Sequence, residues 1–482
     1  MRGSPLRLRR ALPLAGALLA SLALPVAADG HVYKSAAFAH ALVNPAEFAL
    51  TTGATYDTTK NMHPMGFSER RAPTFNSDLA FWGDKAYQGT YAGFRILDIS
   101  EPDNPTVLAN YEDCAVGQGD VVVWDNILIR SWDSNNSNPS RTCDGQPVPA
   151  GPSGGAPGTG GFEGVHIFDV SNPSDPALLG SVDLPCGSHT ASGFPDVDNG
   201  RFILYSTPSS GSCDGIDVIE IPLDAPGKPV YHGLTLAGQN AEDANGIACH
   251  DTGIILGSAM KAACAGGQGF AVWSIGGEDG GSFTAPKFLY SKRLNASNGV
   301  TIGHSAAFSW DGDTLIFGHE PGGGSAARCQ ETGTVLNPQS GALQTDDMKS
   351  FFFFDVATGG QIGKWTLPRS QGATENCTLH NLNVVPTGKR DVLVHGSYQS
   401  GIGVLDFTNP AAAKEVAFAD PEPISEDQLV LGGDWSSYWY DGRIYESDIT
   451  RGLMVWNLSD KTTAGAARLG YSNPQTQAFT ID

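Results

Sequence analysis

Histidine side chains recur at one position of a repeated pattern in this chain. Aligning the repeats on a turn and stepping back seven residues reaches a polar residue in almost every copy. The positions are Asn76, Gln118, His189, Asp243 or Ala244, His304, His380 and Asp434. Three of them are histidines, in a chain with 11 in total. Because neutral imidazole is a common metal ligand, this spacing predicts a metal site wherever the repeats converge.

The strand that follows each turn ends with a second set of candidates, which adds two histidines. The predicted metal ligands are His189, His304, His380, His319 and His395. The additional candidates for a ligand or a general base are Asp434, Glu446 and Asp243. Imidazole and carboxylate groups together suit zinc, copper, iron or manganese. The alternative is that these side chains line a wet channel that holds no metal.

His250 depends on how the fourth repeat is aligned. Taking His250-Asp251 as the turn places this histidine at the far end of its strand. A disulfide between Cys249 and Cys264 fits only a different register, and that register returns His250 to the other histidines. The sequence leaves both arrangements open.

Seven short apolar strands provide the framework for these residues. They lie at 94–99, 165–170, 216–221, 270–275, 351–356, 403–407 and 453–458. Asp-Gly pairs such as Asp311-Gly312 and Asp441-Gly442 mark hairpin turns in front of two of them. Strands repeated at this period predict an all-β fold, a seven-bladed β-propeller of four-stranded antiparallel blades.

Two segments also carry a family resemblance. The stretches GFRILDISEPDNPTVLANY and GVHIFDVSNPSDPALLGSV resemble the LVIVD repeat of exported bacterial β-propeller proteins. The resemblance implies a propeller fold and an exported setting. It supplies no catalytic residues.

The ends of the chain define its expected organisation. Residues 1–28 read as a signal peptide, with a basic start and an apolar run too short to span a membrane. Residues 29–75 are expected to be a leader, with a ring-closing strand as one alternative. The propeller is expected over 76–471 and a tail over 472–482. A formal charge of −22 argues against nucleic acid as a partner. We therefore expect an extracellular or periplasmic protein without a transmembrane segment.

Eight cysteines in an exported chain indicate disulfides. Neighbours in sequence make the natural pairs, which are Cys114–Cys143, Cys186–Cys213, Cys249–Cys264 and Cys329–Cys377. Most of them would brace loops around the histidines. The sequence thus predicts a module that binds a small molecule or a surface partner through a disulfide-braced channel face. The alternative is a metal-dependent oxidase or hydrolase that uses the channel histidines.

Overall fold

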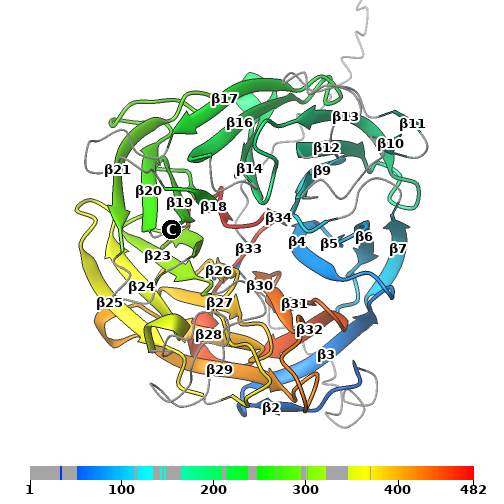
Figure 1. The fold of residues 1–482 in the computed structure, drawn as a ribbon, viewed down its shortest axis with the longest axis vertical. Helices are drawn as coiled ribbons and strands as arrows, with labels where there is room; N and C mark the ends of the chain where they lie inside the picture. Colours follow the sequence, from blue (N-terminus) through cyan, green and yellow to red (C-terminus); the bar gives the residue numbers. More distant parts are fainter. Residues whose placement is uncertain are drawn as a thin grey trace, which may run out of the picture.

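The structure is a computed structural model. It describes residues 33–34, 52–112, 117–133, 142–143, 146–147, 164–208, 213–236, 247–267, 269–294, 300, 302–321, 346–369 and 371–481. These residues form seven large antiparallel sheets arranged as a ring around a central channel (Figure 1). The predicted seven-bladed propeller of four-stranded blades is confirmed. Among the described residues, no helix has the length and apolar character needed to cross a membrane.

Each blade runs outward from the channel as a four-stranded meander. The first three blades consist of β4 (Asn76–Trp82), β5 (Lys85–Thr90), β6 (Gly93–Asp98) and β7 (Thr106–Tyr111); β8 (Val121–Trp124), β9 (Ile127–Trp132), β12 (Gly164–Asp169) and β13 (Ala177–Asp183); and β14 (Ala191–Asp196), β15 (Arg201–Ser206), β16 (Gly215–Pro222) and β17 (Val230–Leu236). A short hairpin, β10 (Thr142–Cys143) with β11 (Gln146–Pro147), is inserted in the second blade's sequence.

The remaining blades repeat this plan. They consist of β18 (Cys249–Ile255), β19 (Lys261–Gly266), β20 (Gly269–Ser274) and β21 (Lys287–Arg293); β22 (Gly303–Phe308), β23 (Thr314–His319), β24 (Ser350–Asp355) and β25 (Gln361–Thr366); β26 (Leu382–Val384), β27 (Val392–Gly396), β28 (Ile402–Asp406) and β29 (Lys414–Pro421); and β30 (Asp434–Tyr440), β31 (Arg443–Asp448), β32 (Gly452–Leu458) and β3 (Met62–Glu69). Single 3-10 turns occur at Val197–Asn199, Asp346–Lys349, Pro410–Ala412 and Lys461–Thr463.

The ring is closed by a strand from the N-terminal part of the chain. β3 pairs antiparallel with β32, from Met62 opposite Leu458 to Glu69 opposite Gly452, and becomes the outer strand of the seventh blade. β2 (Tyr56–Thr58) adds to the outer edge of the sixth blade. Because the last blade takes strands from both ends of the described chain, the ring cannot open without breaking a complete strand pairing.

The core lies between the blades, which explains why the third strands read as continuous apolar runs. Alternate side chains of a strand face opposite sides of its sheet, and in a propeller both sides are covered by neighbouring blades. In β24, Phe353 stacks on Phe407 of the sixth blade at 5.3 Å. The next residue, Phe354, contacts Phe270 of the fourth blade at 4.8 Å. The run of four phenylalanines is therefore buried on both faces.

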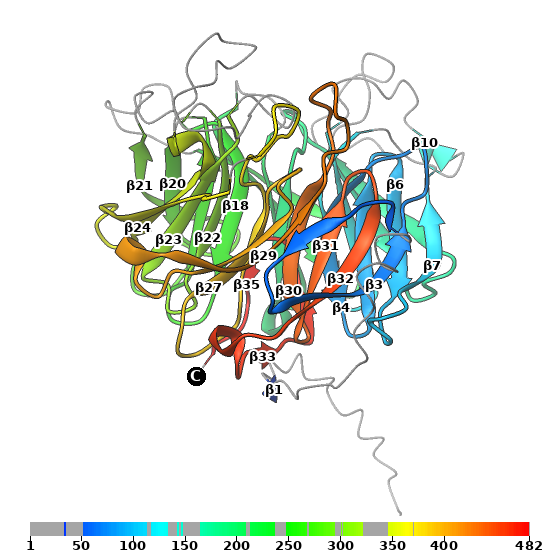
Figure 2. The same cartoon turned by 90° about the horizontal axis from the view of Figure 1, so that it is seen from below.

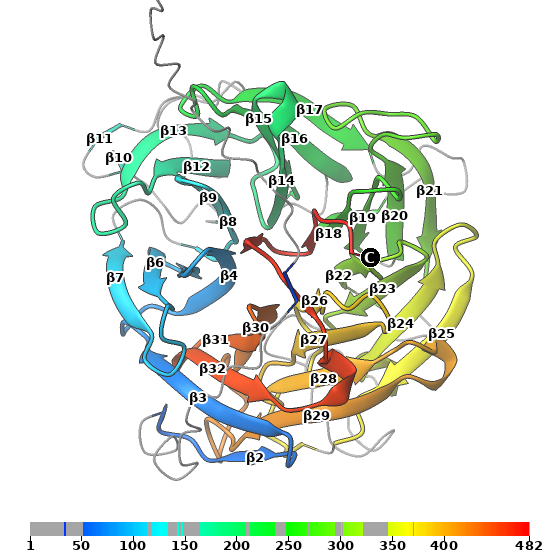
Figure 3. The same cartoon turned by 180° about the vertical axis from the view of Figure 1, so that it is seen from behind.

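The C-terminal segment covers one end of the channel. β34 (Tyr471–Ser472) pairs with β4, and β35 (Thr476–Gln477) runs parallel to β18. β33 (Ala467–Arg468) pairs with β1 (Tyr33–Lys34) on the same side of the ring (Figure 2). Figure 3 shows this segment crossing the middle of the ring. The segment contacts the last residues of the innermost strands β4 and β18, so it covers that end of the channel. The opposite end, where the innermost strands start, is the channel mouth.

Asn473 anchors this segment. Its side-chain oxygen accepts a hydrogen bond from the Val123 backbone N–H at 2.8 Å, and its amide donates to the Val123 carbonyl at 3.0 Å. The side chain is 1% exposed, so removing it leaves buried backbone groups without partners.

We expect Asn473→Ala to lower the free energy of unfolding by about 1 to 3 kcal/mol, because two buried backbone groups lose their hydrogen bonds. Urea unfolding followed by fluorescence measures the change. The matched control is Asn104→Ala, at an exposed asparagine in an outer turn. Equal unfolding midpoints for the two variants would contradict the anchoring role.

Candidate metal centre at the channel mouth

The register of the innermost strands slips where they start. The slip lies between Asn76 and Leu79, Cys249 and Asp251, Gly303 and Ala306, and Asp434 and Ser436. Such a bulge leaves residues without a cross-strand partner. Their side chains no longer follow the alternation between the two faces of the sheet. His250, His304 and Trp435 occupy three of these bulges, and all three line the channel mouth.

Four histidines from consecutive blades form a row there. The ring centroids are 4.2 Å apart for His189 and His250, 4.1 Å for His250 and His304, and 4.1 Å for His304 and His380. All four line a cavity of about 310 Å³. The structure thus brings together three of the five histidines predicted as ligands, and His250 is the fourth member of the row.

The fourth blade corrects the sequence alignment. Its turn lies after β18, where Gly257 and Met260 have positive φ values of 69° and 47°. The stretch His250-Asp251, taken as the turn, is the start of the strand instead. Stepping back seven residues from Gly257 reaches His250, the same relation as in the other blades. The Cys249–Cys264 disulfide that required this register is present.

Two predicted ligands, His319 and His395, do not reach the cavity. The Nε2 atom of His319 lies 2.5 Å from the carbonyl oxygen of Asp347, and its ring stacks on Phe317. His395 packs edge-on against Phe351 at 5.2 Å. Both histidines belong to second strands, which lie one strand spacing further from the channel, so their side chains face neighbouring blades rather than the axis.

The predicted carboxylates also lie elsewhere. Asp434 accepts a hydrogen bond from Ser437 at 2.5 Å, and Glu446 accepts one from the Trp456 indole at 2.8 Å. Burial, and then the charge of Asp448, raises the pKa of Glu446 to about 8. Neither carboxylate lines the cavity, because the bulge puts Trp435 at the place expected for Asp434. Asp243 lies outside the described residues.

Glu320 is the carboxylate that the structure brings to the histidines. Its Oε2 atom lies 4.0 Å from Nε2 of His304, and its Oε1 atom lies 4.0 Å from Nε2 of His380. One ligand atom each from His250, His304 and Glu320 lie within 4.8 Å of one another. The sequence analysis missed this residue. The spacing selects His319, one position earlier, as the residue at the end of this strand.

The geometry and electrostatics of the imidazoles suit metal binding. Burial, and then the neighbouring histidines, lowers the pKa values of His250 and His304 well below the usual value, so both rings are neutral at neutral pH. Among the described residues, Nδ1 of His250 has no hydrogen-bond partner although it is buried. A metal ion would satisfy this lone pair, so the residues present fit such a group.

His380 has a defined tautomer. Its Nδ1 atom lies 2.6 Å from the backbone carbonyl of Trp435, which can only accept a hydrogen bond. Nδ1 therefore carries the proton, and Nε2 presents a lone pair toward Glu320. Holding one ring nitrogen this way is how proteins fix the orientation of a ligating histidine.

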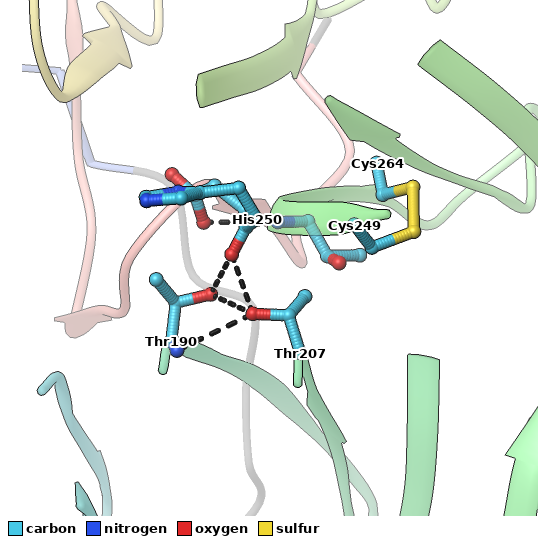
Figure 4. The surroundings of a disulfide bond; sticks show 7 residues. Thr190, Thr207, Cys249, His250 and Cys264 are labelled. Carbon is cyan, nitrogen blue, oxygen red and sulfur yellow. Dashed lines mark hydrogen bonds between the residues drawn. A yellow bond between two sulfur atoms is a disulfide. The ribbon is translucent and has the colours of Figure 1, made fainter. Parts of the chain in front are cut away.

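Hydroxyl groups and a disulfide hold His250 in place. Thr190 and Thr207, both from the third blade, donate hydrogen bonds to its backbone carbonyl, the first at 2.6 Å (Figure 4). The preceding residue, Cys249, is tied to Cys264 (Figure 4). This strand start is therefore fixed from two blades at once.

A second expected disulfide, Cys186–Cys213, is present and lies near His189 in sequence. Cys377, three residues before His380, is also in a disulfide, but its expected partner Cys329 lies outside the described residues. Cys114 and the side chain of Cys143 are likewise outside them. Within the described part of the chain, each cysteine whose side chain is described is bonded.

Three aspartates lie in the cavity lining or next to residues that line it. Asp120 lines the cavity, Asp251 follows His250, and Asp78 accepts a hydrogen bond from Asn381 at 3.1 Å. Burial raises the pKa of all three, and the proximity of Asp78 raises those of Asp120 and Asp251 further. Like charges so close cannot all ionise, which favours protonated carboxyl groups next to the cavity.

Comparison with known proteins identifies the repeat in two segments of the chain. Residues 76–113 and 161–184 match the family model of the LVIVD repeat. No curated protein matches the chain. A solved protein from Lactobacillus plantarum is 12% identical, with a TM-score of 0.49 and coverage of 84% of this chain and 97% of that one. The Myceliophteria thermophila Cps50 (Swd1) β-propeller domain is 10% identical, with a TM-score of 0.46 and coverage of 81% and 100%. At this level neither likeness bears on function.

The buried histidines outside the cavity predict a pH effect on stability. Burial, and then Arg369, lowers the pKa of His395 to about 3, whereas the unfolded value is about 6.5. Between these values the unfolded chain binds the proton and the folded chain does not. His395 therefore makes stability fall as the pH drops from about 6.5 toward 3, by about 1.4 kcal/mol per pH unit.

The native protein and His395→Gln differ in their free energy of unfolding. We expect this difference to decrease as the pH is lowered, by about 1.4 kcal/mol per pH unit below about 6.5. Taking the difference cancels the opposing contributions of the buried aspartates. Urea unfolding at several pH values between about 7 and 5 measures it. The exposed His232→Gln substitution is the control, and a pH-independent difference for His395→Gln would count against a buried neutral imidazole.

Proposed function

We propose that this β-propeller, which carries LVIVD repeats, is an exported binding module that holds one transition metal ion at its channel mouth and presents it to a small molecule. The observation that carries the proposal is the convergence of His250, His304 and Glu320 within 4.8 Å. The two described disulfides and the signal-peptide-like start support the exported setting.

The ligand chemistry supports a borderline divalent ion such as zinc, copper, iron or manganese. Two neutral imidazoles and one carboxylate form a set that such ions accept. His380 lies beside Glu320 and is available as a further ligand. His189 stands at the edge of the row, where its Nδ1 atom lies 2.6 Å from a carboxylate oxygen of Asp133. A bound ion would supply a Lewis acid to a molecule in the cavity.

A metal-dependent hydrolase or oxidase is the second candidate. The observation that favours it is the number of protein ligands, since three ligands beside a cavity leave coordination positions for water or substrate. Asp120, with its raised pKa, would place a protonated carboxyl group at the same cavity. Loss of a measured turnover in metal-depleted protein, and its return with the ion, separates this candidate from simple binding.

We expect about one metal ion per chain in the purified protein and less than about a tenth of that in His304→Gln, because the substitution removes a central ligand. Elemental analysis of both proteins measures it, after incubation with zinc, copper, iron or manganese. His319→Gln is the matched control, a buried histidine outside the cavity, and it should keep the metal. A native protein that takes up none of the four ions contradicts the proposal, as does equal retention by both variants.

Tyr398 is expected to position the carboxylate ligand. Its phenol donates a hydrogen bond to Oε1 of Glu320 at 2.5 Å. We expect Tyr398→Phe to weaken metal affinity by about 10- to 100-fold, as the loss of such a supporting hydrogen bond does elsewhere. Competition with a chromophoric chelator measures it, with Tyr438→Phe as a buried tyrosine control that does not line the cavity. Unchanged affinity in Tyr398→Phe would rule out the positioning role.

A further inference from the structure

An aromatic wall continues the cavity lining from His380. Tyr91 and Trp435 both line the cavity, with their ring centroids 6.2 Å apart and the rings at 87°. Trp435 also contacts His380, with centroids 4.8 Å apart. Tyr398 lines the cavity beside the proposed ligands, since its ring contacts His380 at 4.7 Å and its phenol donates to Glu320. The cavity lining therefore passes from imidazoles to larger rings where His380 meets Trp435.

These rings are fixed in place before any ligand arrives. Phe75 packs edge-on against Tyr91 at 5.6 Å. Tyr398 adopts a positive φ of 48°, a strained conformation for a tyrosine, and two backbone hydrogen bonds with Asp434 hold it there. Trp435 is 7% exposed. A wall that is rigid in advance costs little ordering entropy when a molecule binds to it.

The charges around the cavity disfavour an anion. Among the described residues that line it, none is lysine or arginine, while Asp120 and Glu320 supply carboxyl groups. The rings of His250, His304 and His380 are packed with centroids 4.1 Å apart, a spacing that does not allow them all to carry a positive charge. In the metal-free protein, a carboxylate or phosphate would therefore meet no lysine or arginine of the lining, at a large desolvation cost.

We infer that the cavity takes a small uncharged molecule with one aromatic ring, packed against Trp435 and Tyr91 with its polar substituent toward the histidine row. Aromatic pairs with edge-to-face or offset geometry are favoured beyond the apolar area they bury, and the crossed rings of the wall offer such contacts. A volume of about 310 Å³ accommodates a single-ring compound. The orientation of the substituent rests on the proposed metal site, whereas the contact with the aromatic wall does not.

Three probes of similar size test the ligand class, namely phenol, cyclohexanol and benzoate. Binding is measured by titration calorimetry at about pH 7.5, where phenol is uncharged, with metal-free and with zinc-loaded protein. In the metal-free protein we expect saturable binding of phenol, weaker binding of cyclohexanol by about threefold to tenfold, and weaker binding of benzoate by at least about tenfold. In the metal-free protein, binding of cyclohexanol or benzoate as tight as that of phenol, or tighter, overturns the inference. The absence of saturable phenol binding in both forms overturns it as well.

Variants locate the binding. Trp435→Leu and Tyr91→Leu should each weaken phenol binding by about tenfold, since each removes one ring of the wall. Trp310→Leu is the matched control, because Trp310 lies away from the cavity, in the turn that follows the innermost strand β22. Its indole N–H donates a hydrogen bond to the backbone carbonyl of Val384. Tyr91 is only half-buried, so its variant keeps the test decisive if Trp435→Leu does not fold. Unchanged phenol affinity in Tyr91→Leu overturns the assigned wall.

The two proposals fail separately in this experiment. If phenol binding depends on Tyr91 in a protein that takes up no metal, the proposed metal centre is contradicted and the inferred ligand class is supported. If the protein takes up metal but binds phenol in neither form, the ligand class is contradicted and the metal centre is supported.

Discussion

The interruption of the strand ladder at the channel mouth is the constraint on which this site depends. A regular innermost strand would turn its side chains toward the two neighbouring blades, where the core already occupies the space. The register slips before Asp251, Ala306 and Ser436 release the preceding residues from that alternation. His250, His304 and Trp435 thereby reach one cavity from three different blades. Their convergence follows from a repeated backbone irregularity rather than from a special loop.

Burial then sets the protonation states of the side chains that meet at the channel mouth. Imidazoles packed ring against ring lose their protonated form, and carboxyl groups beside one another lose their ionised form. The cavity that results is polar but largely uncharged, apart from the carboxylate chemistry that Glu320 can supply. The C-terminal segment covers the far end of the channel, where it bonds to the ends of several innermost strands (Figure 3). The cavity thus combines uncharged imidazoles, one of them with an unpartnered Nδ1 atom at His250, with aromatic rings. This combination is what an ion and a small organic molecule would need together.

Much of this architecture could be predicted from the sequence, because local signals define it. The apolar third strands and the Asp-Gly turns predict the blades, and a fixed distance from turn to strand start finds His189, His304 and His380. The same rule fails for the fourth blade, where Asp251-Thr252-Gly253 resembles a turn although the strand continues through it. It also selects Asp434 instead of Trp435, since a bulge shifts the channel-facing position by one residue without any sequence signal.

Other features depend on packing that no local pattern reports. His319 and His395 look equivalent to the channel histidines by spacing, yet their second strands direct them between blades. Glu320 directly follows β23, and it becomes important only because its carboxylate meets Tyr398 of the next blade, which donates a hydrogen bond to it. The covering of the far channel end by residues 471–477 depends on contacts with distant strands, which the tail's own sequence does not indicate.

The most direct test of the central claim is a crystal structure of the zinc-soaked protein with anomalous diffraction data collected on both sides of the zinc edge. The account predicts an anomalous peak at the channel mouth, within bonding distance of His250, His304 and Glu320. An empty mouth at full zinc occupancy elsewhere, or an ion held only by surface carboxylates, would contradict it.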